Sequence, residues 1–460
     1  IRTDEWHAVE GISIQDAIDN AADGDTIIVH GGIYEEQLYI AKSRDLKAAE
    51  GESPEIRAPE PAMLENYDFD FEIMPDRIGP FSATPIIMVN GSSDDVSVDI
   101  TGFVIDGSSV APENSEFGID GMLYLRADGT IEGNEVKNIW GIRGRTAEGR
   151  IMWSGFAVFM FSDSDYPNNA TIRRNNVHDY TGVESFGIYV MGKGCRATIT
   201  ENTVTGARSP EFPDQSGITV CDHATATLTS NIVSDCIYTK EFGYAVGIMF
   251  TDSNGTIQSN TLIDCGININ SGFFSPHSTV SIKDNTVDAP GVHEADWGPL
   301  VGIELELYEK PIPWYEGEAS ITATIECNRL IGVSGIGVPS TGISLRGEEN
   351  TSCGSVNAMI ARNTISGWEC GIELLEQSDS TVYLNDFVDN TQNVFVNEST
   401  NVYSSPEEID YTCDGRDYTS YLGNYWHDYA GEDANADGIG DAPYDINSSD
   451  NYPLMHPEEN

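Results

Sequence analysis

The sequence predicts an all-β fold, a right-handed parallel β-helix (solenoid) of roughly ten coils with an N-terminal capping helix and a C-terminal loop-rich tail. Three observations predict it: an asparagine that recurs along the chain, short glycine-led strands between the asparagines, and one amphipathic segment near the start. We expect a cap over residues 1–25, the solenoid over 26–400, and a tail with a calcium-like loop over 401–460.

The first predicted element is a short helix. Residues 13–22 place apolar side chains at helical spacing after Ser13, a residue type that caps helices, and Asp23-Gly24-Asp25 ends the pattern. Such a helix would cover the apolar end of the solenoid, as terminal repeats do in other solenoids. The segment 26–29 then begins the first coil.

The coils are predicted from a repeat in which an apolar residue precedes an asparagine by three positions. Successive asparagines are 41, 27, 29, 29, 25, 43, 35 and 22 residues apart, so a period in the twenties is lengthened by insertions near 59–86, 138–168 and 288–318. Equivalent short strands of neighbouring coils then pair in parallel, about 4.8 Å apart. In register, the asparagine amides can bond one another as an inward ladder, although the alternative is that they only form surface turns. The predicted ladder residues are Asn134, Asn175, Asn202, Asn231, Asn260, Asn285, Asn328, Asn363 and Asn385.

The composition restricts the partners. Seventy-five acidic against 23 basic residues give a formal net charge of −52, which repels phosphate backbones and argues against nucleic-acid binding. The same charge favours divalent cations, high salt or cationic partners. No run of about 18 apolar residues predicts a transmembrane segment.

Cysteines and glycosylation sequons favour an extracellular, cell-surface or envelope location. The abrupt start at Ile1 fits a mature protein whose export signal is gone or was never there. Eight cysteines are present; Cys236 with Cys265 and, more weakly, Cys195 with Cys221 are disulfide candidates, the alternative being buried thiols. The candidate glycosylation sites are Asn90, Asn169, Asn254, Asn350, Asn397 and Asn447.

A calcium-type loop is predicted near the C-terminus. Oxygen-bearing side chains alternate from Asp433 onward, and Gly438 supplies a sharp turn. Tyr444 stands where an EF-hand would carry its bidentate glutamate, so that ligand would have to come from Asp445 or elsewhere. The expected ligands are Asp433, Asn435, Asp437, Ile439 (through its carbonyl), Asp441 and Asp445, with a structural role in fixing the tail, against the alternative of an acidic turn.

No catalytic motif stands out, and no catalytic residue is predicted. The Asp94-Asp95 pair lies in a turn-like segment, and the eight histidines show no metal-ligand spacing. The insertion near 288–318 carries aromatic and acidic residues suited to sugar stacking, to a subunit contact or simply to covering the coils. These residues are His293, Asp296, Trp297, Pro311, Pro313, Trp314 and Tyr315.

The segments IQDAIDNAADGDTIIVHGGIYEEQLYI and LGNYWHDYAGEDANADGIGDAPYDINSSDNYPLM, together with the asparagine coils, resemble the NosD-type family of carbohydrate-binding-and-hydrolase-like β-helix proteins of methanogenic archaea. The resemblance covers nearly the whole chain and is weaker over 55–115. It implies a secreted or surface-anchored β-helix. It leaves the activity open, because the family includes copper-maturation factors, surface-layer components and polysaccharide-acting relatives.

Three functions are consistent with these features. The first expectation is a structural protein of an archaeal cell envelope, a sheath or surface layer, that self-associates as a homopolymer or lattice; the absence of a catalytic motif weakens an enzymatic reading without removing it. The alternative is an extracellular protein that binds or acts on polysaccharide as a lyase, epimerase or hydrolase, which would need carboxylates brought together from distant coils. The third is an accessory factor for metal maturation, against which the scarcity of methionine and histidine clusters argues.

Overall fold

The computed structural model describes the chain as two compact units, Ile1–Met249 (unit 1) and Phe250–Asn460 (unit 2). The described residues are 5–69, 81–91, 95–108, 118–145, 151–153, 155–162, 167–182, 185–207, 215–236, 246–271, 277–289, 300–307, 319–335, 339–347, 354–446 and 449–457, without the side chains of 81, 143–145 and 151–153.

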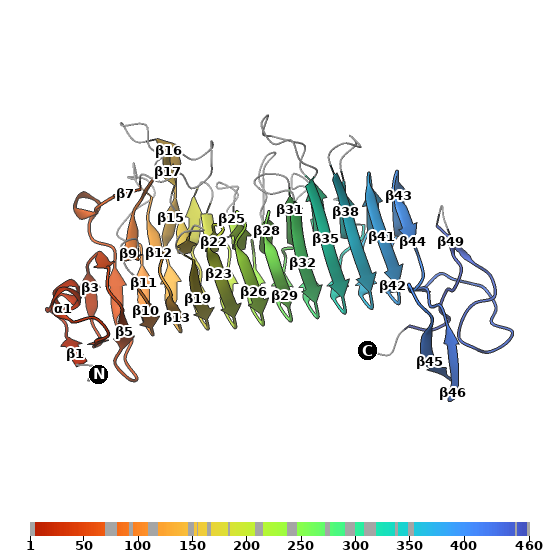
Figure 1. Cartoon of the computed structure of the whole chain (residues 1–460), viewed down its shortest axis with the longest axis horizontal. Coiled ribbons are helices and arrows are strands. Elements are labelled where there is room, and N and C mark those ends of the chain that lie inside the picture. The colour runs from red at the N-terminus through yellow and green to blue at the C-terminus, as the bar shows by residue number, and fades with distance from the viewer. Residues whose placement is uncertain are drawn as a thin grey trace. The chain divides into compact units, whose positions relative to one another are not determined.

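Unit 1 consists of coils, and a full coil contributes one strand to each of three parallel sheets, A, B and C (Figure 1). In order across sheet A lie β1 (Glu5–Ala8), β2 (Thr26–Val29), β5 (Arg44–Ala48), β10 (Val98–Thr101), β13 (Gly129–Glu132), β19 (Asn168–Arg173), β23 (Cys195–Thr200) and β26 (Thr225–Thr229). Sheet B contains β3 (Ile33–Glu35), β6 (Glu55–Arg57), β11 (Val104–Asp106), β14 (Glu135–Lys137), β20 (Asn176–Val177), β24 (Thr203–Thr205) and β27 (Ile232–Ser234). Sheet C contains β4 (Leu38–Ile40), β9 (Pro85–Asn90), β12 (Asp120–Leu125), β18 (Phe156–Phe161), β22 (Ser185–Met191) and β25 (Gln215–Cys221).

Unit 2 has the same construction. Its sheet A strands are β29 (Asn254–Gln258), β32 (His277–Lys283), β35 (Ala319–Glu326), β38 (Gly354–Ala361), β41 (Ser378–Tyr383) and β44 (Thr400–Val402). Its sheet B strands are β30 (Thr261–Ile263), β33 (Thr286–Asp288), β36 (Arg329–Ile331), β39 (Thr364–Ser366), β42 (Asp386–Val388) and β47 (Tyr425–Trp426). Its sheet C strands are β31 (Ile267–Ser271), β34 (Leu300–Leu307), β37 (Ser340–Arg346), β40 (Cys370–Leu375) and β43 (Gln392–Asn397), and β28 (Ile248–Thr251) contains the unit boundary.

The predicted all-β parallel solenoid is therefore confirmed, with more coils than expected. Coils before Asn134 lack the ladder asparagine, and sheets A and B continue beyond residue 400 in β44 and β47. The tail adds two hairpins, β45 (Ile409–Cys413) with β46 (Arg416–Ser420) and β48 (Tyr444–Asp445) with β49 (Ser449–Asp450).

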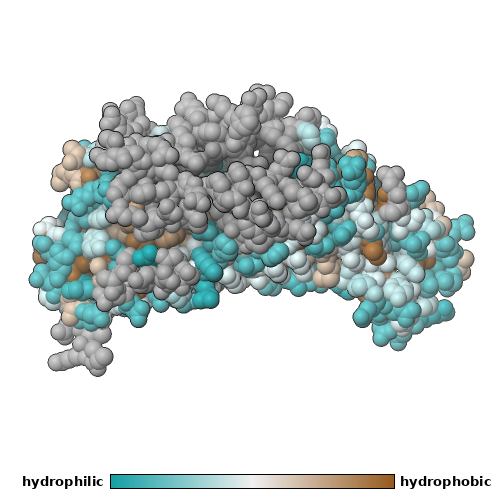
Figure 2. All heavy atoms as spheres, turned by 45° about the horizontal axis from the view of Figure 1, so that its top comes forward, coloured by the Kyte–Doolittle hydropathy of each residue, from teal (hydrophilic) through white to brown (hydrophobic). Residues whose placement is uncertain are grey.

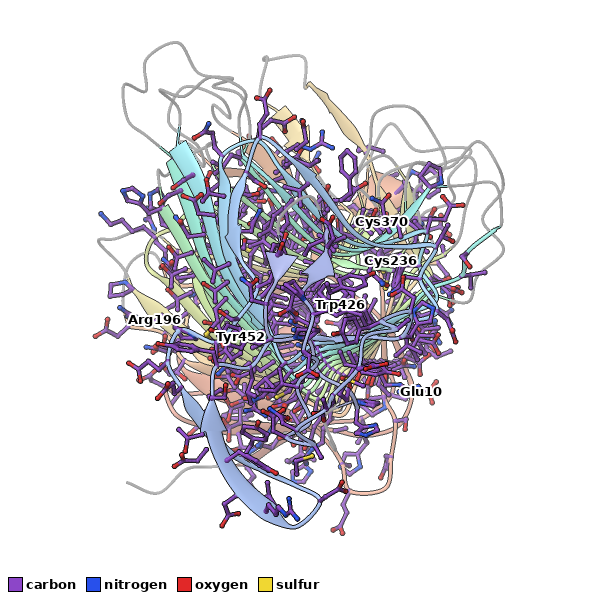
Figure 3. The ribbon with its side chains drawn as sticks, turned by 90° about the vertical axis from the view of Figure 1, so that its right-hand side faces the viewer. Glu10, Arg196, Cys236, Cys370, Trp426 and Tyr452 are labelled. Atoms are coloured by element: carbon purple, nitrogen blue, oxygen red, sulfur yellow. The ribbon has the colours of Figure 1, made fainter. Side chains whose placement is uncertain are left out.

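Parallel register stacks identical inward positions to form the core. In sheet A of unit 1, Ile131, Ile172, Ile199 and Leu228 lie opposite one another and have no exposed surface. Viewed along the coils, Trp426 lies inside the ring of strands, whereas Arg196 lies on the outside (Figure 3). On the face shown in Figure 2, the surface of the described residues is mainly hydrophilic, in keeping with the acidic composition.

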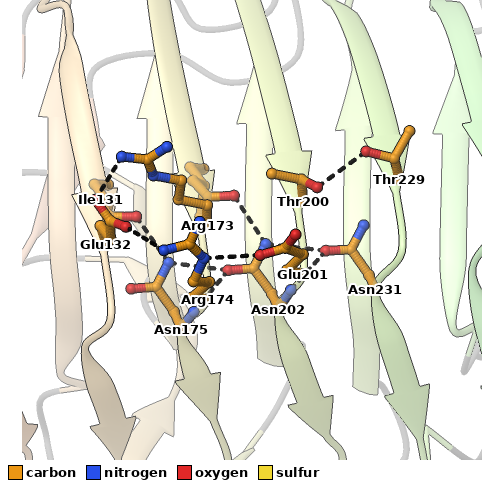
Figure 4. A network of polar contacts seen from close by, with 11 residues as sticks. Ile131, Glu132, Arg173, Arg174, Asn175, Thr200, Glu201, Asn202, Thr229 and Asn231 are labelled. Carbon is orange, nitrogen blue, oxygen red and sulfur yellow. Dashed lines mark hydrogen bonds and ion pairs between the residues drawn. The ribbon is translucent and has the colours of Figure 1, made fainter.

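The asparagine ladder is confirmed by its hydrogen bonds. The Asn175 Nδ2 donates to Asn202 Oδ1 (2.9 Å) and to the Ile131 carbonyl (2.9 Å), and the Asn175 backbone N–H donates to the same Asn202 Oδ1 (3.0 Å; Figure 4). Each Oδ1 thus accepts two bonds and each amide donates along the axis. The same bonds to the next Oδ1 join 134–175 and 202–231 in unit 1, and 260–285–328–363–385 in unit 2.

The residue before each ladder asparagine, and not the asparagine itself, adopts the left-handed backbone conformation. Its φ lies between 55° and 63°, and most of these residues are not glycine. The positions are Gly133, Arg174, Glu201, Ser230, Ser259, Asp284, Cys327, Arg362 and Leu384. The turn places the asparagine side chain inward, where the ladder can hold it.

The ladder ends at a buried carboxylate that the repeat did not predict. Asn385 donates to Asn424 Oδ1 through its backbone N–H (3.1 Å) and Nδ2 (2.9 Å). Asn424 then donates its backbone N–H to Asp450 Oδ2 (2.8 Å), which also accepts from Trp426 Nε1 (2.9 Å). Asp450 is fully buried, and its other oxygen accepts the backbone N–H of Tyr452 (2.9 Å).

The N-terminal end carries the predicted helix, α1 (Ile14–Asn20), with Ser13 as its N-cap. Ile14 and Ile18 are buried, consistent with a cover over the first coil. Glu36, which follows β3, accepts the N–H groups of Ile14 (2.8 Å) and Gln15 (3.1 Å), so a carboxylate stabilises the positive end of the helix. The segment 1–25 also contains β1, which pairs with β2 in sheet A and was not predicted.

The described parts of two insertions cover the coils. β7 (Tyr67–Phe69), β8 (Phe81–Ala83), β16 (Arg143–Arg145) and β17 (Ile151–Trp153) form a small separate sheet. Phe69 and Ala83 belong to a buried apolar cluster with Met88, Leu123 and Phe159 of sheet C. The described part of the insertion near 59–86 therefore covers apolar outward side chains of sheet C in unit 1.

The predicted disulfides are not formed. Cys195 and Cys236 are buried thiols, so neither Cys195–Cys221 nor Cys236–Cys265 is bonded. Cys195 begins a sheet A strand, whereas Cys221 ends a sheet C strand and donates to Tyr189 Oη (3.1 Å). The Cys236 sulfur lies 3.3 Å from Tyr180 Oη, so the cysteines pack as small buried groups. Cys353 lies outside the described residues.

Removing one rung should destabilise unit 1 strongly. In Asn202→Ala, the backbone N–H and Nδ2 of Asn175 lose their acceptor and the Ile172 carbonyl loses a donor. We expect a loss of about 2 to 4 kcal/mol in the free energy of unfolding, measured by chemical denaturation. Thr198→Ala, an exposed position on the neighbouring strand, is the control; equal effects of the two variants would contradict a ladder that stabilises the fold.

Candidate functional site

The outer face of sheet C in unit 2 carries a group of polar side chains on neighbouring coils. Along β34, Ile303 and Leu305 are fully buried on the inside, so Glu304 and Glu306 project from the opposite face. Strand register places Asn268, Glu304, Ser344 and Glu373 in one row, and Asn270, Glu306 and Arg346 in the next. We call these seven residues the glutamate cluster.

Glu304 is held by an amide relay. The Asn268 Nδ2 donates to Glu304 Oε2 (2.7 Å), and the Asn270 Nδ2 donates to Asn268 Oδ1 (2.8 Å). Burial raises the pKa of Glu304, and the charge of Glu373 acts in the same direction; the Asn268 bond and the Arg346 charge oppose the rise. The relay fixes the Glu304 carboxyl where it can accept hydrogen bonds.

Glu306 is affected mainly by burial and neighbouring charges, whereas Glu304 also accepts a hydrogen bond from Asn268. Burial, with a further contribution from the Glu304 charge, raises the pKa of Glu306 to about 7, although Arg346 opposes the rise. The Asn270 Oδ1 is buried and, among the described residues, has no hydrogen-bond partner. Because Asn270 and Glu306 are register partners, a protonated Glu306 carboxyl is suited to donate to this oxygen.

The cluster therefore combines a carboxyl that holds a proton near neutral pH with a neighbouring carboxyl that already accepts a hydrogen bond. Two titratable groups in different environments are the usual basis for general acid and base catalysis. Arg346 supplies one cation beside them, in a chain with few basic residues.

The sequence contains a pattern that predicts part of this cluster. The segment Ile303-Glu304-Leu305-Glu306-Leu307 alternates glutamate with large aliphatic residues, which predicts a strand with two carboxylates on one face. The inward positions of this strand are apolar, so its carboxylates lie on the outer face. Arg346 and Glu373 join the cluster only through coil register, which depends on the lengths of the intervening loops.

The predicted calcium ligands lie in a loop whose oxygens bond the loop's own backbone. Asp433 accepts the N–H groups of Asp437 (3.2 Å) and Gly438 (2.9 Å), and Asp437 accepts that of Ile439 (2.9 Å). Among the described residues, no three acidic, histidine or cysteine side chains converge as a metal-binding group. The oxygen chemistry suits Ca²⁺, but the arrangement does not form a coordination shell, so calcium binding stays a prediction.

The remaining loop ligands are engaged in similar bonds. Asn435 Oδ1 accepts the Asp437 N–H (3.0 Å), and Asp441 Oδ2 accepts the Ala434 N–H (2.9 Å). Asp445 lies in β48 and lines a hollow with Asn393 and Asp428.

The glycosylation candidates differ in exposure. Asn169, Asn254 and Asn397 are exposed, whereas Asn90 is partly exposed and its Nδ2 donates to Tyr39 Oη (3.0 Å). Asn350 and Asn447 lie outside the described residues, as do Asp94 and the aromatic and acidic residues singled out in the insertion near 288–318.

Sequence profiles of known families match two parts of the chain. The profile described as a right-handed β-helix region matches residues 85–306, and that of the periplasmic copper-binding protein NosD matches residues 320–431. The chain is a right-handed parallel β-helix protein. No curated protein sequence matches it significantly.

Several solved structures are similar to the chain, at low sequence identity and with TM-scores below 0.5. The exopolygalacturonase of Thermotoga maritima is 11% identical over 92% of this chain and 95% of its own, with a TM-score of 0.48. The surface adhesin PfbA of Streptococcus pneumoniae is 12% identical (89% and 95% covered, TM-score 0.45). A mannuronan C-5 epimerase module of Azotobacter vinelandii is 12% identical (85% and 94%, TM-score 0.33). No helix of the described chain has the length and apolarity needed to span a membrane.

Glu306 should make stability depend on pH. Its pKa rises from 4.5 to about 7 on folding, so the folded state retains a proton that the unfolded chain releases. Its stabilising contribution is full below about pH 4.5 and is lost as the pH rises through 7. As the pH rises from 4 to 8, the free energy of unfolding of Glu306→Gln, measured with urea, should therefore increase relative to that of the wild type. The same gain in Asp379→Asn, an exposed position on sheet A, would contradict this origin.

Calcium should stabilise the tail if the loop binds it. We expect added Ca²⁺ to raise, and a chelator to lower, the melting temperature of the C-terminal region, because carboxylates that now bond backbone amides would gain a cation. Asp437→Asn should remove the calcium response, while exposed Asp414→Asn should keep it. Melting that ignores Ca²⁺ and chelator would rule the site out.

Proposed function

We propose that this β-helix protein is extracellular and acts on polysaccharide through the glutamate cluster. The observation that carries the proposal is the meeting of Glu304, Glu306 and Glu373 with Arg346 on adjacent coils, where burial keeps Glu306 protonated near neutral pH. Charged groups are rarely buried unless they are paired or functional.

The direction of the cluster suits a linear polymer. Its rows run across strands, so equivalent positions repeat about every 4.8 Å along the coil axis. A polymer lying across the coils would meet Glu304, Ser344 and Glu373 in succession. Each sugar ring would then find an acceptor or donor from a different coil.

The chemistry assigned to the cluster is general acid and base catalysis. Glu306 gives a proton to a leaving oxygen, and Glu304, the carboxyl that accepts the Asn268 amide, takes a proton from water or from a ring carbon. Arg346 binds a hydroxyl or carboxylate of the substrate and limits the build-up of negative charge. Hydrolysis and elimination both fit these roles; new reducing ends identify the first and unsaturated ends the second.

Self-association in a cell envelope stays a separate prediction. Helix α1 covers one end of unit 1, and Asp450 ends the ladder of unit 2. These features lie at the first and last coils, where axial stacking would place a second molecule. Electron microscopy of the protein with and without Ca²⁺ tests it: ordered sheets or tubes would support an envelope role, and dispersed particles would oppose it.

The enzymatic proposal is tested with a panel of neutral and acidic polysaccharides, scoring reducing and unsaturated ends. We expect Glu306→Gln and Glu304→Gln each to lower kcat by roughly 100-fold or more, because each removes a proton-transfer group. Asp379→Asn should keep wild-type kcat, and folding of all variants is checked by circular dichroism. Products formed by the two glutamine variants at the wild-type rate, or by none of the proteins on any substrate, would overturn the proposal.

A further inference from the structure

A second hollow lies in unit 1, near helix α1, and is separate from the glutamate cluster. It encloses about 590 Å³ and is formed by the turn after β3, strand β4, the 3-10 turn η1 (Pro61–Met63) and β7. Figure 1 shows α1, β3 and β7 together at this end of unit 1. The residues that line it include Glu35, Gln37, Tyr39, Met63, Glu65 and Tyr67.

The floor of the hollow is an aromatic platform. The Tyr39 and Tyr67 rings stack with centroids 5.7 Å apart and planes inclined by 14°. Tyr39 is 37% exposed and Met63 is 70% exposed, so apolar surface faces solvent at this point. Tyr39 begins the outer row of sheet C that continues through Met88, which is buried.

The hollow is preformed by a glutamine clamp. The Gln37 Nε2 donates to the carbonyls of Glu65 (2.9 Å) and Pro85 (2.8 Å), and Gln37 Oε1 accepts the Glu65 N–H (2.8 Å). Both the nitrogen and the oxygen of the Gln37 side-chain amide are therefore hydrogen-bonded, and they hold the insertion beside sheet C. A site fixed in this way loses little conformational entropy on binding.

The rim offers acceptors that remain available. Within the described chain, the Glu65 carboxylate makes no hydrogen bond or ion pair, and Glu35 reaches Arg57 only at 3.9 Å. Tyr39 Oη accepts from Asn90 Nδ2 (3.0 Å), which leaves its own hydrogen free to donate. Burial, then the charge of Glu65, raises the pKa of Tyr67 to about 12, so its hydroxyl also stays protonated.

We infer that this hollow is a saccharide-binding site for neutral or amino sugars. The apolar C–H face of a sugar ring packs on Tyr39 and Met63, while ring hydroxyls or an ammonium group donate to Glu35 and Glu65. Among the described residues that line the hollow, none is lysine or arginine, so an acidic sugar would meet carboxylates and is disfavoured by charge. A ligand without hydroxyls would leave these carboxylates desolvated and unpaired.

This site binds and does not catalyse, so it stands independently of the proposed enzymatic function. Its occupant is a saccharide because the site combines a flat aromatic surface with acceptor groups only at the rim. A polyamine would satisfy the carboxylates but would not require the ring platform, and it therefore serves as a comparison ligand in the test.

Calorimetry with the full chain tests the inference, using neutral hexose and pentose oligosaccharides, a glucosamine oligosaccharide, an oligogalacturonate and spermidine. We expect the neutral or amino oligosaccharides to bind and the oligogalacturonate not to bind. Tyr39→Ala should weaken binding at least tenfold, Glu65→Gln several-fold, and Tyr39→Phe less than threefold because the ring remains.

The matched control is Tyr421→Ala. Tyr421 is also 37% exposed and pairs with Tyr452 at a centroid distance of 5.7 Å, but its rings are tilted by 42°. Equal losses in Tyr421→Ala and Tyr39→Ala, tight binding of spermidine alone, or no binding of any saccharide would overturn the inference. The effects of Tyr39→Ala and Glu65→Gln report on the hollow itself, so failure of the enzymatic proposal would leave this result unchanged.

Discussion

The fold of this chain depends on an amide that is donor and acceptor along the same axis. Each ladder asparagine closes a bond to the next coil and a bond to a carbonyl of the preceding one. These bonds offset the cost of the left-handed residue before it, about 1 to 3 kcal/mol for a residue with a side chain. Once that turn is fixed, strand register follows, and every inward and outward row of the three sheets is set.

Register in turn gives sheet C two different outer faces. In unit 1 the outward positions are Met88, Leu123 and Phe159, which need the small covering sheet to exclude water. In unit 2 the outward positions of the same sheet include Glu304 and Glu306. The same arrangement of strands therefore supports a covered apolar surface in unit 1 and rows of polar side chains in unit 2.

The parts of this structure that could be predicted are those encoded locally. The apolar residue and the asparagine three positions later lie in one turn, so the ladder from Asn134 to Asn385 could be read from spacing alone. Asn424 was missed because the residue three before it, Tyr421, is partly exposed and breaks the pattern. The glutamate cluster was missed because Glu304, Arg346 and Glu373 meet only through register across loops of unequal length. The disulfide predictions failed for a related reason, because similar spacing does not place two sulfur atoms within bonding distance.

Asp450 gives the ladder a direction and an end. A carboxylate accepts hydrogen bonds from the last asparagine, Asn424, but has no hydrogen to donate to a further coil. The row of amide hydrogen bonds therefore ends at Asp450. Every rung before it is chemically interchangeable with its neighbours. The number of coils can therefore change by whole units, through duplication or loss of one repeat, without altering either end. Solenoid length is in this sense a freely variable property of the protein, whereas its termination is specified by a single side chain.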